Sequence, residues 1–109
     1  MVFVKRNSNN FSRRSFGYAI FDEGNFDKWM NLFMIAETLR RDICLREGWP
    51  VGESYINNYE WCTVTPPEAY ALSTHICDGY NKCVGNIPTI EELERDIKKY
   101  KGLLNNGED

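Results

Sequence analysis

The alternation of apolar and polar residues predicts two short strands near the start of the chain. Residues 2–4 are apolar and β-favouring, and in residues 15–21 large apolar side chains alternate with mostly small ones. A period of two residues is typical of a half-buried strand. Gly17 indicates a bulge or a close neighbour within the second strand. Between the strands, residues 5–14 are polar, basic and rich in turn formers, which predicts an exposed basic loop.

A long amphipathic helix is predicted next. Apolar residues recur at helical spacing from Phe26 to Cys44, and Asn25 is suited to be the N-cap. Gly48 stands where a left-handed residue commonly ends a helix, and Pro50 follows it. The apolar arc is broad, so we expect this helix to pack centrally, with neighbours on two sides.

Two capping boxes predict two further helices. Residues 65–68 and residues 89–92 each place a threonine three positions before a glutamate. The first helix is expected to run over residues 66–80, and the second to reach the tail at residues 105–109, which we expect to fray. Residues 59–64 are β-favouring and predict a third strand.

These elements predict one α+β domain over residues 1–109. Their order is β-β-α-β-α-α, and the strands are too few and short for anything larger than a small antiparallel sheet of two or three strands packed by three helices. The chain has 109 residues, 42% of them hydrophobic and 14% aromatic, which is enough to form one core.

The chain has no feature that predicts a membrane or secreted protein. No apolar run reaches the roughly 18 residues of a membrane span, and the first residues do not resemble a secretory signal. We therefore expect a cytoplasmic protein with no membrane partner and with its four cysteines reduced. A secreted domain with two disulfides is the alternative interpretation.

Charge is distributed unevenly. The formal net charge is −3, yet the first twenty residues hold four cations and none of the 16 acidic residues. The overall acidic balance disfavours a nucleic-acid partner, because domains that bind DNA usually present a basic face. The basic segment could instead bind an anionic nucleotide or metabolite. The residues for such a ligand site are Lys5, Arg6, Phe11, Arg13 and Arg14.

Candidate metal ligands are present, but their spacing is poor. Cys62, His75, Cys77 and Cys83 could supply three thiolates and an imidazole to zinc. Zinc knuckles place paired ligands two to four residues apart on a tight turn. On one helix, His75 and Cys77 would point about 200° apart. We therefore expect no bound metal or other cofactor.

No motif predicts a reaction. His75 is the one histidine, and Asp78 would lie beside it on a helix, as in either a catalytic pair or a solvated helix face. Glu37 lies near the apolar stripe and is the best candidate for a catalytic carboxylate. The alternative for Glu37 is an ion pair with Arg40 or Arg41, which is the commoner arrangement on helices.

Aromatic residues are abundant, which favours a protein partner. The chain has three tryptophans, six tyrosines and six phenylalanines. Aromatic and arginine side chains dominate the binding energy of protein interfaces. The candidate anchors are Trp49, Tyr55, Ile56, Arg13 and Arg14. The alternative is that the aromatic side chains of this region close one end of the core.

We therefore expect a small non-enzymatic intracellular protein that binds and modulates another protein as an inhibitor, adaptor or regulator. Small size, an acidic composition and the lack of a catalytic motif are also typical of small proteins of phages and mobile elements. Homo-oligomers are compatible with the exposed aromatic residues. One alternative is an oligomeric protein that sequesters a nucleotide or another small ligand between its protomers. The other is a minor enzyme that works through His75 or Glu37.

Overall fold

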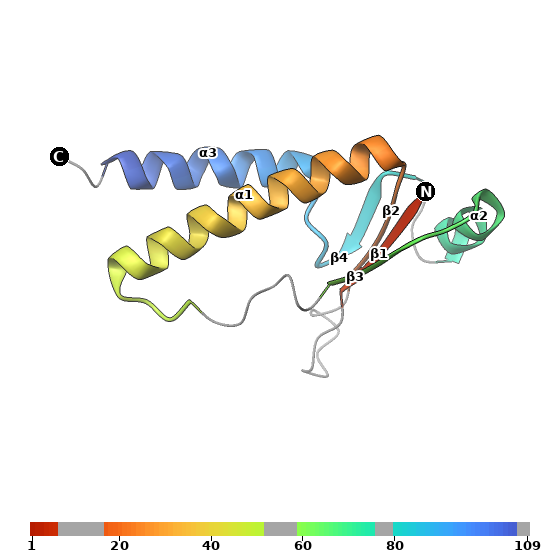
Figure 1. The fold of residues 1–109 in the computed structure, drawn as a ribbon, viewed down its shortest axis with the longest axis horizontal. Coiled ribbons are helices and arrows are strands. Elements are labelled where there is room, and N and C mark those ends of the chain that lie inside the picture. Colours follow the sequence, from red (N-terminus) through yellow and green to blue (C-terminus); the bar gives the residue numbers. More distant parts are fainter. Residues whose placement is uncertain (7–16, 52–58, 76–79, 107–109) are drawn as a thin grey trace.

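The computed structural model describes residues 1–6, 17–51, 59–75 and 80–106, which form three helices and four strands (Figure 1). In chain order these are β1 (Val2–Arg6), β2 (Gly17–Phe21), α1 (Glu23–Glu47), β3 (Tyr59–Thr63), α2 (Pro66–His75), β4 (Lys82–Gly85) and α3 (Ile90–Asn106). The α+β class is confirmed. The predicted order and the predicted two or three strands are wrong, because β4 adds a fourth strand between α2 and α3.

The four strands form one sheet in the order β3-β1-β2-β4, and every neighbouring pair is antiparallel. In the central strand β1, Val4 is fully buried and lies between Ala19 of β2 and Trp61 of β3. Strand β1 also includes Lys5 and Arg6, which the sequence placed at the start of the basic loop. The rest of that loop, residues 7–14, lies outside the described residues.

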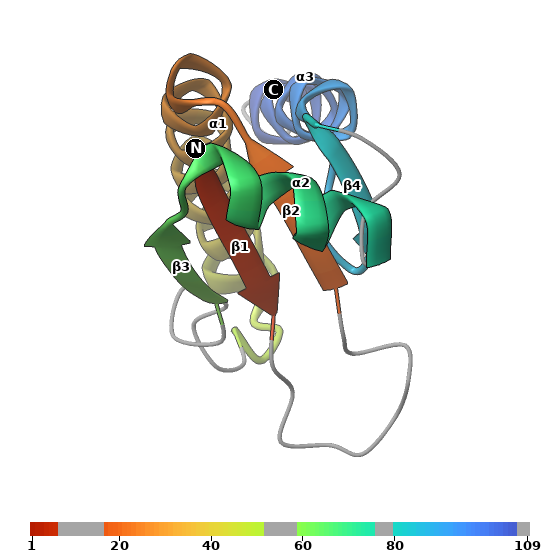
Figure 2. The ribbon, with the colours of Figure 1, turned by 90° about the vertical axis from the view of Figure 1, so that its right-hand side faces the viewer.

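Both faces of the sheet are covered by helices. Helices α1 and α3 lie on one face, and α2 lies on the other (Figures 1 and 2). Strand β2 is consequently buried on both sides: Phe21 belongs to the core under α1 and α3, and Ile20 packs with Ala69 of α2. The expectation of a half-buried strand was wrong here, since it took account of only one covering layer.

Local signals set the ends of α1. Its N-cap is Asp22 rather than Asn25, and the carboxylate of Asp22 accepts a hydrogen bond of 2.8 Å from the N–H of Asn25. Gly48 ends the helix with φ 71°, as predicted from its position. A left-handed residue at this place allows the next N–H to bond a carbonyl of the last turn.

The centre of the core is aromatic. Trp29 is fully buried, stacks on Phe33 with ring centroids 5.2 Å apart, and meets the edge of Tyr59 at 5.7 Å. Its Nε1 donates a 2.8 Å hydrogen bond to the carbonyl of Pro88, so the buried indole has its polar partner. This bond ties α1 to the segment that leads into α3.

The capping box before α2 is confirmed. The N–H of Glu68 donates to Oγ1 of Thr65, and the N–H of Thr65 donates to the Glu68 carboxylate. Helix α2 ends at His75, whereas the sequence predicted a helix that reaches Tyr80. Tyr80 lies in a turn, so the predicted end is wrong. Residues 76–79 are outside the described residues.

The capping box before α3 is confirmed in part, because the N–H of Glu92 donates to Thr89 Oγ1 at 3.0 Å.

Within the described residues, none of the helices combines the length and the apolar character needed to cross a bilayer.

Helices α1 and α3 lie side by side and run together past the sheet toward the C-terminus (Figure 1). Near their starts, Lys28 and Glu94 form an ion pair at 3.8 Å. At the far end, Arg46 Nη1 donates to the carbonyls of Leu103 and Leu104 at 3.1 and 3.4 Å. The cation thereby satisfies carbonyls in the last turn of α3, where a positive charge is favourable. The two helices thus form a paired arm whose free end is exposed.

Candidate functional site

The arm ends in three exposed apolar side chains, which we call the helix tip. Leu45 lies in the last turn of α1, Trp49 follows the end of α1, and Leu103 lies in α3. Their exposed fractions are 61%, 59% and 44%. The expected exposure of Trp49 is therefore present, and the alternative in which Trp49 closes the core is wrong. The other predicted anchors, Tyr55, Ile56, Arg13 and Arg14, lie outside the described residues, as does Phe11.

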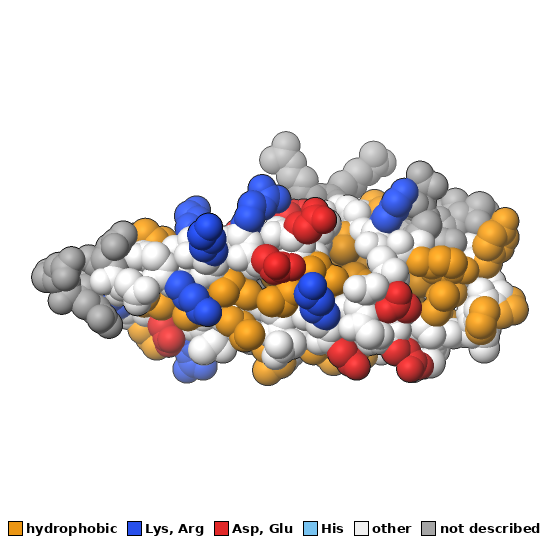
Figure 3. Space-filling model, turned by 90° about the horizontal axis from the view of Figure 1, so that it is seen from above, with side chains coloured by type: hydrophobic (Ala, Val, Ile, Leu, Met, Phe, Trp, Pro, Cys, Tyr) orange, Lys and Arg blue, Asp and Glu red, His pale blue; other side chains and the backbone are white. Residues whose placement is uncertain are grey.

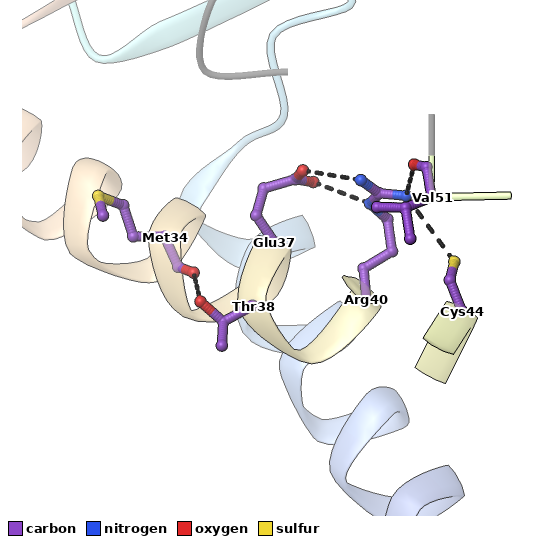
Figure 4. Close-up of polar contacts among 6 residues, drawn as sticks. All are labelled: Met34, Glu37, Thr38, Arg40, Cys44 and Val51. Carbon is purple, nitrogen blue, oxygen red and sulfur yellow. Dashed lines mark hydrogen bonds and ion pairs between the residues drawn. The ribbon is translucent and has the colours of Figure 1, made fainter. Parts of the chain in front are cut away.

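The backbone around Trp49 is held by hydrogen bonds, although its side chain is exposed. The N–H of Trp49 donates to the carbonyl of Cys44 at 2.9 Å. Two residues further on, the carbonyl of Val51 accepts a 3.0 Å hydrogen bond from Arg40 Nη1 (Figure 4). The indole is therefore presented by an ordered turn, because the backbone is anchored on both sides of it.

Glu37 and Arg40 form the ion pair that the sequence offered as an alternative to catalysis. Arg40 Nε donates to Oε1 of Glu37 at 3.3 Å, and Nη2 donates to Oε2 at 3.2 Å (Figure 4). Both carboxylate oxygens accept hydrogen bonds from one guanidinium, which is a strong and directional arrangement. The same guanidinium holds Val51, so the pair connects α1 to the turn that carries Trp49.

Beside this ion pair lies an open cleft of about 270 Å³ between α1, α3 and the ends of β1 and β3. Its lining is Arg6, Phe33, Ala36, Glu37, Arg40, Tyr59, Pro88, Leu93, Asp96 and Tyr100. The guanidinium of Arg6 lies 5.8 Å from the ring centroid of Tyr59. Burial raises the pKa of Tyr100, and the negative charge of Asp96 raises it further.

The cleft joins residues that the sequence analysis did not connect. Asp96 and Tyr100 are four positions apart in α3 and so share a helix face, which was the available signal. Their approach to Glu37 and Arg6 required the packing of α3 on α1 and the sheet. Of the predicted ligand-binding residues, the structure describes Lys5 and Arg6, and Arg6 alone lines the cleft.

Sheet order separates two of the four candidate zinc ligands. Cys62 lies on β3 and Cys83 lies on β4, at opposite edges of the sheet. Three inter-strand spacings place them roughly 14 Å apart, whereas two thiolates on one zinc lie within about 2.3 Å of the ion. Cys62 and Cys83 therefore cannot bind the same ion. Cys77 and the side chain of His75 are outside the part of the chain that the structure describes.

A second gathering of apolar side chains lies at the opposite end of the molecule, around α2. Figure 3 shows it beside a helix pair whose upper surface carries scattered charges of both signs. Tyr70 of α2 is 68% exposed, the largest exposed fraction among the exposed large hydrophobic side chains of the described residues. Tyr70 is therefore a natural comparison for Trp49, since both are exposed aromatic residues at opposite ends.

Comparison with protein-family models, with curated proteins and with solved structures finds no match. Functional inference for this chain therefore depends on its own surface chemistry. On the described residues, the strongest candidates for a site are the helix tip and the polar cleft between the helices and the sheet.

Proposed function

We propose that this protein binds another protein through the helix tip and modulates it, as an inhibitor, adaptor or regulator inside the cell. The observation that carries the proposal is Trp49, which is 59% exposed while the backbone on both sides of it is fixed by hydrogen bonds. Tryptophan is the residue type most enriched among the dominant contacts of protein interfaces.

An ordered turn makes Trp49 a better anchor than a tryptophan in a loose loop. Binding costs free energy for each side chain and loop that must be immobilised. The hydrogen bonds of Trp49 and Val51 already impose order on the backbone in the free protein. More of the binding free energy from burying the indole is then available for affinity.

The neighbouring groups suit an interface centred on an aromatic residue. Leu45 and Leu103 add exposed apolar area at the same end of the arm. Arg46 joins the two helices and leaves part of its side chain exposed, which gives this apolar area a polar margin. Apolar anchors with polar groups around them are the usual composition of a binding surface.

Of the residues that the sequence analysis offered for an anion site, the polar cleft contains Arg6, and its other charged groups suit an anion poorly. Arg40 already donates to Glu37 and to Val51, so the guanidinium is committed to the fold. Glu37 and Asp96 also place two carboxylates in the lining, which oppose a negatively charged ligand. These contacts favour the helix tip over the cleft as the functional surface.

The test is affinity capture from cells that naturally make the protein, with three forms of the bait: wild type, Trp49→Ala and Tyr70→Ala. We expect one partner to be retained by wild type and by Tyr70→Ala and to be lost by Trp49→Ala. The partner is then purified, and its affinity for the three forms is measured. Loss of a dominant aromatic anchor typically costs about 2 kcal/mol or more, a roughly 30-fold weakening.

Circular dichroism of Trp49→Ala should match that of wild type, because the side chain is outside the core. Equal retention of the partner by Trp49→Ala and wild type would refute the proposal. Loss with Tyr70→Ala alone would move the binding surface to α2. A rise in melting temperature with a nucleotide, abolished by Arg6→Ala, would instead assign function to the cleft.

A further inference from the structure

Within the part of the chain that the structure describes, strand β3 lies at an open edge of the sheet. Figure 2 shows it as the outermost strand, with α1 behind the sheet and α2 crossing in front of β1 and β2. Among the described residues its strand partner is β1, which it meets over all five positions. Residues 60–63 are exposed. An exposed edge strand presents backbone groups that can pair with another chain.

The register identifies which backbone groups face outward. The N–H of Val64 donates to the carbonyl of Met1 at 2.7 Å. Along an antiparallel strand, successive residues direct their N–H and C=O groups alternately toward the two sides. Cys62 therefore directs its backbone groups toward β1, whereas Trp61 and Thr63 direct theirs away from the sheet.

The opposite edge of the sheet differs in ways that discourage pairing. Strand β4 has only four residues, begins with Lys82 and ends at Gly85, whose φ of 72° takes the chain out of the extended conformation. Short edge strands and lysine are common means of preventing contact between sheet edges. Strand β3 contains neither lysine nor proline, and its one charged residue is Glu60.

We propose that the β3 edge binds the β3 edge of a second copy of this chain, antiparallel and about a two-fold axis that passes through Cys62. In this register Trp61 of each copy faces Thr63 of the other. Each such pair exchanges two backbone hydrogen bonds, so all outward groups of Trp61 and Thr63 are satisfied. A two-fold axis uses the same surface on both copies, which a self-complementary strand allows.

Side-chain positions agree with this register. Trp61 is 44% exposed and packs on Phe26 of α1 with ring centroids 6.2 Å apart, so a neighbouring strand would cover more of the indole. The two Glu60 carboxylates would lie about 13 Å apart along the strands. This distance exceeds the roughly 8 Å screening length at physiological salt, so their repulsion is small.

The register also makes a distinctive geometric prediction at Cys62, which is exposed and free. The two copies of Cys62 face each other as a pair without hydrogen bonds, for which the Cα–Cα distance is about 4.5 Å. A disulfide requires roughly 4.4–6.8 Å between the Cα atoms. A thiol oxidant should therefore link the two copies through Cys62 without moving the backbone.

The experiment measures mass by sedimentation velocity up to a concentration of about 100 μM, because small strand-pair interfaces are weak. We expect the mass of wild type to rise from 12.7 kDa toward twice that value. Diamide is then added; it takes up two electrons and two protons as two thiols become one disulfide. We expect a covalent dimer with wild type and none with Cys62→Ser, which keeps the other three cysteines.

The blocking variant is Thr63→Pro. Proline removes an N–H that faces outward and places its ring on the open edge, while the hydrogen bonds of Cys62 to β1 remain. We expect Thr63→Pro to be monomeric, to give little covalent dimer, and to melt within a few degrees of wild type. Trp49→Ala should dimerise like wild type, because the helix tip is a different surface.

A wild-type protein that stays monomeric over the whole concentration range overturns the proposal. So does a dimer that persists in Thr63→Pro or that fails to link through Cys62. If Thr63→Pro does not fold, the decision rests on the diamide yield of wild type against Cys62→Ser. None of these outcomes affects whether Trp49→Ala loses the protein partner. The proposal of partner binding through the helix tip and the proposal of dimerisation through β3 can therefore fail independently.

Discussion

Asp22 and Asn81 exchange two hydrogen bonds across 59 positions of the chain. The N–H of Asp22 donates to Oδ1 of Asn81, and Nδ2 of Asn81 donates to Oδ2 of Asp22, each at 3.0 Å. Asp22 is also the N-cap of α1, and Asn81 turns the chain into β4 with φ 60°. The pair therefore ties the start of the longest helix to the start of the last strand.

The pKa of Asp22 makes this connection sensitive to acid. Hydrogen bonds from the N–H of Asn25 and from the Asn81 side chain lower the pKa of the Asp22 carboxyl below 3.8. A lowered folded-state pKa means that the ionised form stabilises the fold above the unfolded-state pKa, and that this contribution is lost as pH falls through the folded value.

We therefore expect Asp22→Ala to melt at a lower temperature than wild type near neutral pH. The difference should shrink as pH falls below 3.8. Glu23→Ala, in the adjacent exposed position, serves as the control and should melt close to wild type. A difference between Asp22→Ala and wild type that stays constant down to low pH would contradict the assignment.

Two glycines should respond in opposite directions to alanine. At Gly17, an added Cβ would lie 2.7 Å from the backbone nitrogens of both Asn86 and Ile87, which are too close for a carbon atom. Gly17→Ala should lower the free energy of unfolding by about 1–3 kcal/mol. At Gly102, in α3, nothing lies within 4 Å, so Gly102→Ala should raise it by roughly 0.5–1 kcal/mol. Urea unfolding measures the change in the free energy of unfolding of each variant. If both variants change it in the same direction, the surroundings of one of the two glycines are misassigned.

Arg40→Met should loosen the turn that carries Trp49. Methionine keeps much of the aliphatic side chain but cannot donate to Glu37 or Val51. We expect the free energy of unfolding to fall by about 1.5–3 kcal/mol, the range for hydrogen bonds to charged groups. Hydrogen exchange of the Trp49 N–H should become faster. The matched control is Arg41→Met, at an exposed position of the same helix, and comparable exchange in the two variants would contradict the role of Arg40.

Tyr100 should make stability depend on alkaline pH. Burial, aided by the charge of Asp96, raises its pKa above 10.0. A raised folded-state pKa gives stability that is complete below the unfolded-state value and is lost as pH rises through the folded one. Tyr100→Phe should therefore lose less stability than wild type above pH 10.0. Chemical unfolding at several pH values compares the two; parallel losses would mean that Tyr100 does not titrate in this way.

The helices and most of their ends could be predicted from the sequence, because helical periodicity and caps depend on residues a few positions apart. Thr65 and Glu68 bond each other as the capping box requires, and Gly48 adopts the left-handed conformation. The cap of α1 was misplaced because Asp22 and Asn25 are both suitable caps. Asp22 is distinguished by its bonds to Asn81, a residue far along the chain.

The candidate site residues also divide into features that depend on nearby residues and features that depend on distant ones. Trp49 was a candidate anchor because it follows a helix stop, but only the structure decided that it is exposed rather than part of the core. The choice between catalysis and an ion pair for Glu37 likewise depended on where Arg40 points. The separation of Cys62 from Cys83 was invisible in the sequence, where only 20 positions lie between them. It follows from the strand order, which places them on opposite edges.

By itself, the sequence determined the α+β class, the three helices and the three strands with a clear apolar pattern, since these depend on local periodicity and local hydrogen bonds. Tertiary structure alone decided the fourth strand, the two covered faces of the sheet and the position of β3 as an outermost strand. Strand β4 has four residues and little apolar pattern, and it is extended because it pairs with β2 more than sixty positions earlier. Pairing between distant segments is settled by the packing of the whole chain, which no short window of residues contains.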